Sequence, residues 1–135
     1  MWTYEHTART EAAPERLWRL WTDIANWPEW NAGIGRISAS GPLMVGTTIS
    51  FAAPGEDDDV TVTITGLTDG RSFTDQAILG DAVIRTVHQV EPLDDGGARV
   101  VYRTEIDGPP ELAEQIGPAI TGDFPDVVAA LISRC

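Results

Sequence analysis

The sequence predicts an α+β fold in which a curved, seven-stranded antiparallel sheet surrounds a long, kinked C-terminal helix. Two observations indicate this class. Short segments that alternate apolar and polar residues recur along the chain and are separated by turn signals. Helical patterns occur just after the first such segment and again, with a more apolar composition, at the C-terminal end. With 135 residues, the chain is expected to form one domain, residues 1–135.

The strands are identified by their period of two. In the first, residues 2–10, the side chains of Trp2, Tyr4, His6 and Ala8 share one face. The sequence leaves the register of this strand open, and therefore also whether Tyr4 and His6 face a cavity. Six further strands are expected at residues 34–39, 47–53, 60–65, 71–79, 82–92 and 98–107.

Residues 13–31 carry four of the five tryptophans and two helix starts. Pro14 suits the first position of a helix, where its missing N–H is no loss. Asp23 is expected to cap a second short helix, which should end near Pro28. The first helix presents one apolar face, formed by Leu17, Trp18 and Trp21.

The C-terminal segment, residues 109–135, has the apolar spacing of a helix with interruptions. Gly117–Pro118 and Phe124–Pro125 should kink or restart it, because each proline lacks a backbone donor and clashes one turn back. Either Thr121 or Asp123 is expected to cap the restarted half. A bent or two-part helix is the predicted result.

Residues 13–31 read A-P-x-x-L-W-x-L-x-x-D-x-x-x-W-P-x-W-N after an opening strand, and this pattern resembles the START-like (SRPBCC) superfamily. Its members include polyketide cyclases and dehydrases, lipid-transfer domains and the birch-pollen allergens. The run of strands and the apolar C-terminal segment extend the resemblance over essentially the whole chain. It implies a helix-grip fold with a cavity between sheet and helix, but no shared catalytic motif.

Charge and composition limit the partners and the location. A net charge of −12 disfavours nucleic acids and anionic membrane surfaces, which would be repelled. The longest apolar run, residues 127–132, is too short for membrane insertion. Residues 1–6 lack the features of a secretion signal, so a cytoplasmic location is expected. The single cysteine, Cys135, has no partner for an internal disulfide.

No metal or organic cofactor is expected. The acidic run 56–59 fails the EF-hand pattern, because Val62 stands where glycine is required and Thr68 where glutamate is required. The chain has only two histidines, His6 and His88, so a zinc site would need several carboxylates as ligands.

Two turns set the register of the three last strands. Gly80–Asp81 is a two-residue hairpin signal, and residues 94–97 suit a three-residue loop with a glycine in the left-handed conformation. Directly opposed residues point to the same side of a sheet. The turns therefore place two rows on one face, Phe73–His88–Tyr102 and Asp75–Thr86–Thr104.

This face should be the buried one, because Arg85, Arg99 and Arg103 lie on the other. Its polar groups fit either a lined cavity or a core network that satisfies its own hydrogen bonds. The register predicts that the His88 ring lies within hydrogen-bonding distance of Asp75 or Tyr102, directly or through one water. A nearby aspartate would favour the charged form of the imidazole.

The leading functional hypothesis is binding of a small hydrophobic ligand in a cavity of at least about 300 Å³ between sheet and C-terminal helix. The resemblance implies lipid, polyketide or isoprenoid-like ligands. The expected ligand-binding residues are Phe51, Val62, Ile64, Phe73, Ile84, His88, Tyr102, Ile116, Ile120 and Phe124.

Two alternatives stay open. One is a polyketide cyclase or dehydratase-type lyase without metal or organic cofactor, in which His88 acts with Asp75 or Tyr102 in proton transfer. The other is a stress-related or chaperone-interacting module, which would expose a large apolar patch. The sequence indicates no oligomeric state.

Overall fold

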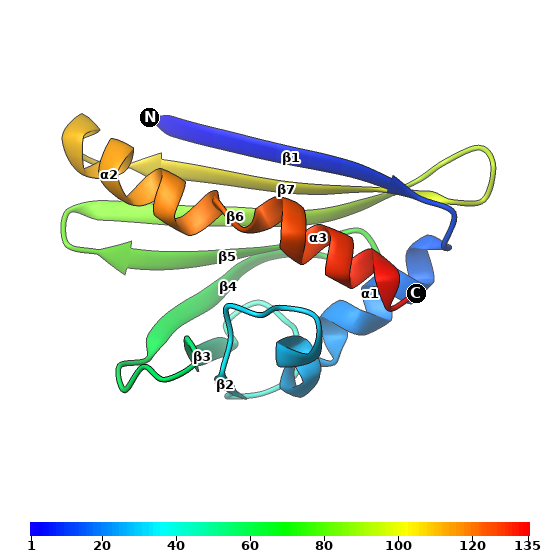
Figure 1. The fold of residues 1–135 in the computed structure, drawn as a ribbon, viewed down its shortest axis with the longest axis horizontal. Helices are drawn as coiled ribbons and strands as arrows, with labels where there is room; N and C mark the ends of the chain where they lie inside the picture. The colour runs from blue at the N-terminus through cyan, green and yellow to red at the C-terminus, as the bar shows by residue number, and fades with distance from the viewer.

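The computed structural model describes all residues, 1–135, and shows the predicted α+β architecture (Figure 1). Seven antiparallel strands form one sheet in the order β1-β7-β6-β5-β4-β3-β2. The sheet therefore places the first and second strands at its opposite edges. The strands are β1 (Trp2–Thr10), β2 (Arg36–Ala39), β3 (Thr48–Ala52), β4 (Val60–Thr68), β5 (Ser72–Leu79), β6 (Ala82–Pro92) and β7 (Ala98–Asp107).

Two short helices follow β1 and two longer ones end the chain. They are α1 (Pro14–Thr22), the 3-10 helix η1 (Ile24–Glu29), α2 (Pro110–Thr121) and α3 (Phe124–Ser133). In Figure 1, α2 and α3 run end to end across one face of the sheet. None of the helices is long and apolar enough to cross a membrane.

The C-terminal helix breaks at one of the two predicted places. A new helix starts at Phe124–Pro125, as expected, whereas Pro118 lies inside α2. Pro118 is exposed, so solvent can satisfy the carbonyl group that a proline leaves without a donor. The predicted caps of α3 are wrong. Thr121 donates to the carbonyl of Gly117, and Asp123 has helical backbone angles and makes no side-chain cap.

The predicted cap of η1 is also wrong, for a different reason. Asp23 precedes the helix, but its carboxylate accepts a hydrogen bond from the Asn26 side chain at 2.7 Å and caps no backbone N–H. Pro28 lies within the helix, which ends one residue later. Pro14 occupies the first turn of α1, as predicted.

The turn chemistry set the register as expected. Gly80 and Gly96 have φ angles of 59° and 88°, in the left-handed region that favours glycine. The observed pairing contains both predicted rows, Phe73–His88–Tyr102 and Asp75–Thr86–Thr104.

The first strand pairs along its whole length with β7, and this settles the register that the sequence left open. His6 lies opposite Tyr102 and Tyr4 opposite Thr104. On the far side of the sheet, the β4–β5 register shifts between Ile64 and Gly66, which marks a β-bulge.

The main core lies between the sheet, α1, η1 and α3. Trp21 of α1 is fully buried and meets the ring of Phe73 edge-on, at 5.5 Å between centroids. From the other side, α3 contributes Val128 and Leu131, which are also fully buried. Trp18, the third residue of the predicted apolar face of α1, is only partly buried.

Candidate functional site

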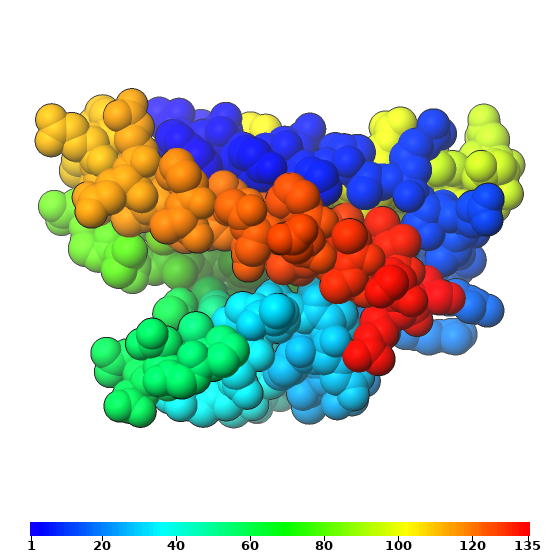
Figure 2. All heavy atoms as spheres, in the orientation of Figure 1, coloured from blue at the N-terminus to red at the C-terminus, as the bar shows by residue number.

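A pocket of about 530 Å³ lies between the sheet and the junction of α2 and α3. Figure 2 shows the surface hollowed between these helices and the segments from η1 to β4. Fifteen of its 23 lining residues are hydrophobic, so its walls are mainly apolar. The exposed side chains of Val60, Ile78 and Leu79 belong to the lining, which means that the pocket opens to solvent beside them.

Eight of the ten expected ligand-binding residues line this pocket, and two do not. Ile64 is 1% exposed and belongs to the main core. Ile116 packs on a small cluster around Ala82 and Ile106 instead. The eight are Phe51, Val62, Phe73, Ile84, His88, Tyr102, Ile120 and Phe124. Neither Tyr4 nor His6 reaches the pocket.

Two pocket-lining residues that follow α1 were not among the expected ligand-binding residues. Trp27 and Trp30 line the pocket from η1 and its C-terminal end. The Trp27 indole donates a hydrogen bond to the carbonyl of Trp21 at 3.0 Å, which fixes its ring. The dense tryptophan content of this segment was the available signal, but the path of a 3-10 turn is needed to aim the rings at the pocket.

His88 lies on the floor of the pocket, on β6. Its ring stacks on Phe73 with 4.2 Å between centroids and an interplanar angle of 6°, and it meets Tyr102 edge-on at 4.6 Å. Its Nδ1 atom is buried and has no hydrogen-bond partner. The ring is therefore held by aromatic packing.

The predicted direct hydrogen bond of His88 is absent. The Nε2 atom lies 3.9 Å from Oδ2 of Asp75, beyond hydrogen-bonding distance. The hydroxyl group of Tyr102 instead accepts a hydrogen bond from the indole of Trp21 at 3.2 Å. Opposed strand positions bring these residues together, but the stacking on Phe73 decides where the imidazole nitrogens point.

The expected charge state of His88 is also wrong. Burial lowers the pKa of His88 to about 3, and the nearby Phe73 backbone opposes this only in part. Burial raises the pKa of Asp75 to about 7. The imidazole is thus neutral at pH 7. Desolvation dominates because Asp75 lies too far away to stabilise an imidazolium through a hydrogen bond.

The second polar row is partly satisfied within the protein. Thr86 and Thr104 are buried and their hydroxyl groups are hydrogen-bonded to each other at 2.9 Å. The carboxyl group of Asp75 has no hydrogen-bond donor, and its side chain is 18% exposed. The concave face thus combines the two sequence alternatives, since the threonine pair forms a core network and Asp75 faces a lined pocket.

Two further carboxylates lie around the pocket. Asp59 forms a salt bridge with Arg36, and Asp123 lies at the break between α2 and α3. Burial raises the pKa of Asp123, and the nearby charge of Asp126 raises it further. The structure gathers no group of three or more histidine, cysteine or acidic residues with the arrangement of a metal site.

Solved structures with the same arrangement of sheet and helix show that the fold is of the helix-grip class. Norcoclaurine synthase from Thalictrum flavum, in complex with dopamine and hydroxybenzaldehyde, is 18% identical, with a TM-score of 0.78 over 98% of this chain and 84% of that one. A Thermobifida fusca protein solved by NMR is 21% identical, with a TM-score of 0.82 over 99% and 93%. Ara h 8.0201 is 15% identical, with a TM-score of 0.67 over 98% of each chain.

The family is established by sequence. Residues 1–135 match the family described as polyketide cyclase / dehydrase and lipid transport, and the chain belongs to it. The resemblance predicted from residues 13–31 is therefore confirmed. No curated protein matches the chain in sequence.

Proposed function

We propose that the protein binds a small, largely apolar molecule that carries one or two polar groups. The pocket of about 530 Å³ carries this proposal, because an apolar lining with a few convergent polar side chains is typical of ligand sites. His88, Asp75 and Tyr102 supply those polar groups, and Thr86 is committed to Thr104. Family membership supports the same function.

A hollow of this size lined mainly by apolar side chains also favours a carrier or an enzyme over a protein-interaction module. Apolar walls in contact with water are unfavourable, by roughly 25 cal/mol for each Å² of exposed apolar surface, and an apolar occupant would remove that cost. The apolar residues at its opening, Val60, Ile78 and Leu79, would then form the entrance.

The proposal can be tested with a variant that fills the pocket. Ala77 of β5 lines it, so Ala77→Phe should weaken binding of the neutral dye N-phenyl-1-naphthylamine by about tenfold or more. Val101→Phe adds an aromatic ring on the opposite face of the sheet, between Thr7 and Gln89, and should leave the affinity nearly unchanged. Equal affinities of the two variants would contradict a ligand in this pocket.

Native mass spectrometry of freshly purified protein supplies the complementary evidence. A small molecule that copurifies with the native protein and is lost from Ala77→Phe would identify the ligand directly.

A cyclase or dehydratase activity is the second candidate, and the pair of Asp75 and His88 favours it. Burial brings the pKa of Asp75 to about 7, so this group can both give and take a proton near neutral pH. The neutral imidazole of His88, 3.9 Å away, can hold a substrate carbonyl group through a hydrogen bond. Aldol cyclisation and dehydration need such proton transfers beside a carbonyl group in a dry pocket. This catalysis would need no metal or organic cofactor.

Asp75→Asn separates the two functions. In an enzyme it should abolish turnover of the copurified molecule even at saturating concentrations, because the amide cannot donate and accept the proton as the acid does. In a carrier there is no turnover to lose.

A further inference from the structure

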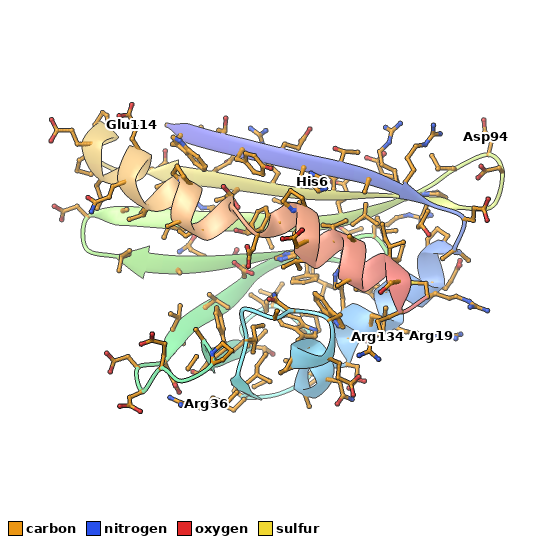
Figure 3. All side chains as sticks on the ribbon, in the orientation of Figure 1. His6, Arg19, Arg36, Asp94, Glu114 and Arg134 are labelled. Carbon is orange, nitrogen blue, oxygen red and sulfur yellow. The ribbon has the colours of Figure 1, made fainter.

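The charged groups around the pocket are all of one sign. The carboxylates of Asp59, Asp75 and Asp123 belong to the lining, and none of the nine arginines, the only strongly basic residues of the chain, does. Figure 3 shows Arg19, Arg36 and Arg134 on the periphery of the molecule. With a net charge of −12, the protein offers an anionic ligand no counter-charge in its pocket.

The three carboxylates differ in what compensates their charge. Asp59 is paired with Arg36 outside the pocket. Asp75, which rises from the floor, accepts no hydrogen bond, and its nearest basic group is the neutral imidazole of His88. The raised pKa of Asp75, about 7, arises from burial without a cation to offset it. A cation placed beside it would supply that compensation.

The walls around Asp75 suit a cation as well. Six aromatic side chains belong to the same pocket lining. Aromatic faces attract cations through their quadrupole, most strongly where water is excluded. The aromatic residues that line the pocket are Trp27, Trp30, Phe51, Phe73, Tyr102 and Phe124.

From this combination we infer that the ligand is an organic ammonium ion with an apolar body, bound with its nitrogen at the carboxylate of Asp75. The inference rests on the proposed function, binding of a small molecule in this pocket, and names the chemical class of that molecule. Fatty acids and other carboxylate ligands are disfavoured by the same charges.

Three probes of nearly equal shape test the assignment: 4-phenylbutylamine, 4-phenylbutan-1-ol and 4-phenylbutanoate. Binding is followed at pH 7.5 by the change in tryptophan fluorescence, since Trp27 and Trp30 line the pocket. The amine should bind at least about tenfold more tightly than the alcohol, since a desolvated charge pair is worth more than 1.4 kcal/mol. The carboxylate should bind most weakly.

Two variants test whether the tighter binding of the amine depends on Asp75. Asp75→Asn should reduce the affinity for the amine to that for the alcohol and leave the alcohol unaffected. Asp94→Asn makes the same change of charge in the β6–β7 turn (Figure 3) and should change neither affinity.

Each outcome has a distinct meaning. If N-phenyl-1-naphthylamine binds and the amine has no advantage over the alcohol, the ammonium assignment is overturned and the proposed function stands. If Asp75→Asn and Asp94→Asn weaken binding of the amine equally, the preference for the amine comes from the overall charge of the protein. That result would also overturn the assignment. If neither the dye nor any of the three probes binds, the proposed function fails as well.

Discussion

The helices α2 and α3 cross the same sheet but bury different kinds of residue. The buried residues of α2 are small, namely Ala113, Gly117 and Thr121, whereas α3 buries Phe124, Val127, Val128 and Leu131. The end of the sheet beneath α3 is therefore filled, and α1 completes it with Trp21. The pocket begins at the junction of the two helices. The small face of α2 leaves room for the Trp2 ring beside Gly117, and the pocket lies at the break between the helices, lined by Ile120, Phe124 and Val127.

The largest expected effect comes from truncating Trp21, which fills the core at the end of the sheet beneath α3. Trp21→Ala should lower the free energy of unfolding by about 4 kcal/mol, because it leaves a large void and removes the donor to Tyr102. Trp18→Ala removes the same side chain from a partly buried position and should cost far less. Urea unfolding measures both, and similar losses in the two variants would contradict the contrast between a filled core and its edge.

The second prediction concerns His88 and Asp75, which lie at the boundary between the filled end and the pocket. Folding raises the pKa of Asp75 from 3.8 to about 7 and lowers that of His88 from 6.5 to about 3. Between about pH 4 and 6.5, the unfolded pair carries one proton on His88 and the folded pair one on Asp75. The pair therefore adds no pH dependence to stability in this window.

Single substitutions should expose two opposite slopes, each of at most about 1.4 kcal/mol per pH unit. In Asp75→Asn the depressed pKa of His88 acts alone, so stability is full above pH 6.5 and falls as the pH falls. In His88→Gln the raised pKa of Asp75 acts alone, so stability is greatest below pH 3.8 and falls as the pH rises toward 7. Urea titrations across this range give the slopes relative to the native protein. If the stability of all three proteins depended on pH in the same way, the transfer of the proton from His88 to Asp75 on folding would be refuted.

The smallest expected effect lies on the floor of the pocket. Thr86→Val removes one partner of a buried hydroxyl pair and leaves Thr104, which is 0% exposed, without its bond. The cost should be about 1–2 kcal/mol, whereas the double variant with Thr104→Val should recover most of it, because both polar groups are then gone. Additive losses in this double-mutant cycle would show that the two hydroxyl groups are independent.

The contrast between fold and site also separates what the sequence predicts from what it does not. Gly80 and Gly96 fix the hairpin registers through local backbone chemistry, so the rows around His88 could be predicted residue by residue. The position of the imidazole nitrogens depends instead on packing against Phe73, and strand pairing says nothing about a side-chain rotamer.

Ionisation was the least predictable property of the site. The pairing of Asp75 with His88 suggested a charged imidazole, but the depth of burial reverses that expectation. Part of this cover comes from Trp21 of α1, whose indole meets the His88 ring edge-on with 6.2 Å between centroids. The alternation pattern of one strand carries no information about side chains that bury it from elsewhere in the sequence. The same holds for Ile116, which packs on the cluster around Ala82 and Ile106 and not in the pocket.

The order of strands in the sheet has a consequence for how the chain reaches this structure. β1 pairs only with β7, and Trp21 finds its partner Tyr102 81 positions further along the sequence. Folding rates fall as contacts join residues more distant in the sequence, because loop closure must precede the gain from contact. During synthesis, the first strand and the tryptophan-rich segment must wait until β7 has emerged from the ribosome. Their apolar faces stay exposed for that interval, when the chain is most open to aggregation or to capture by chaperones.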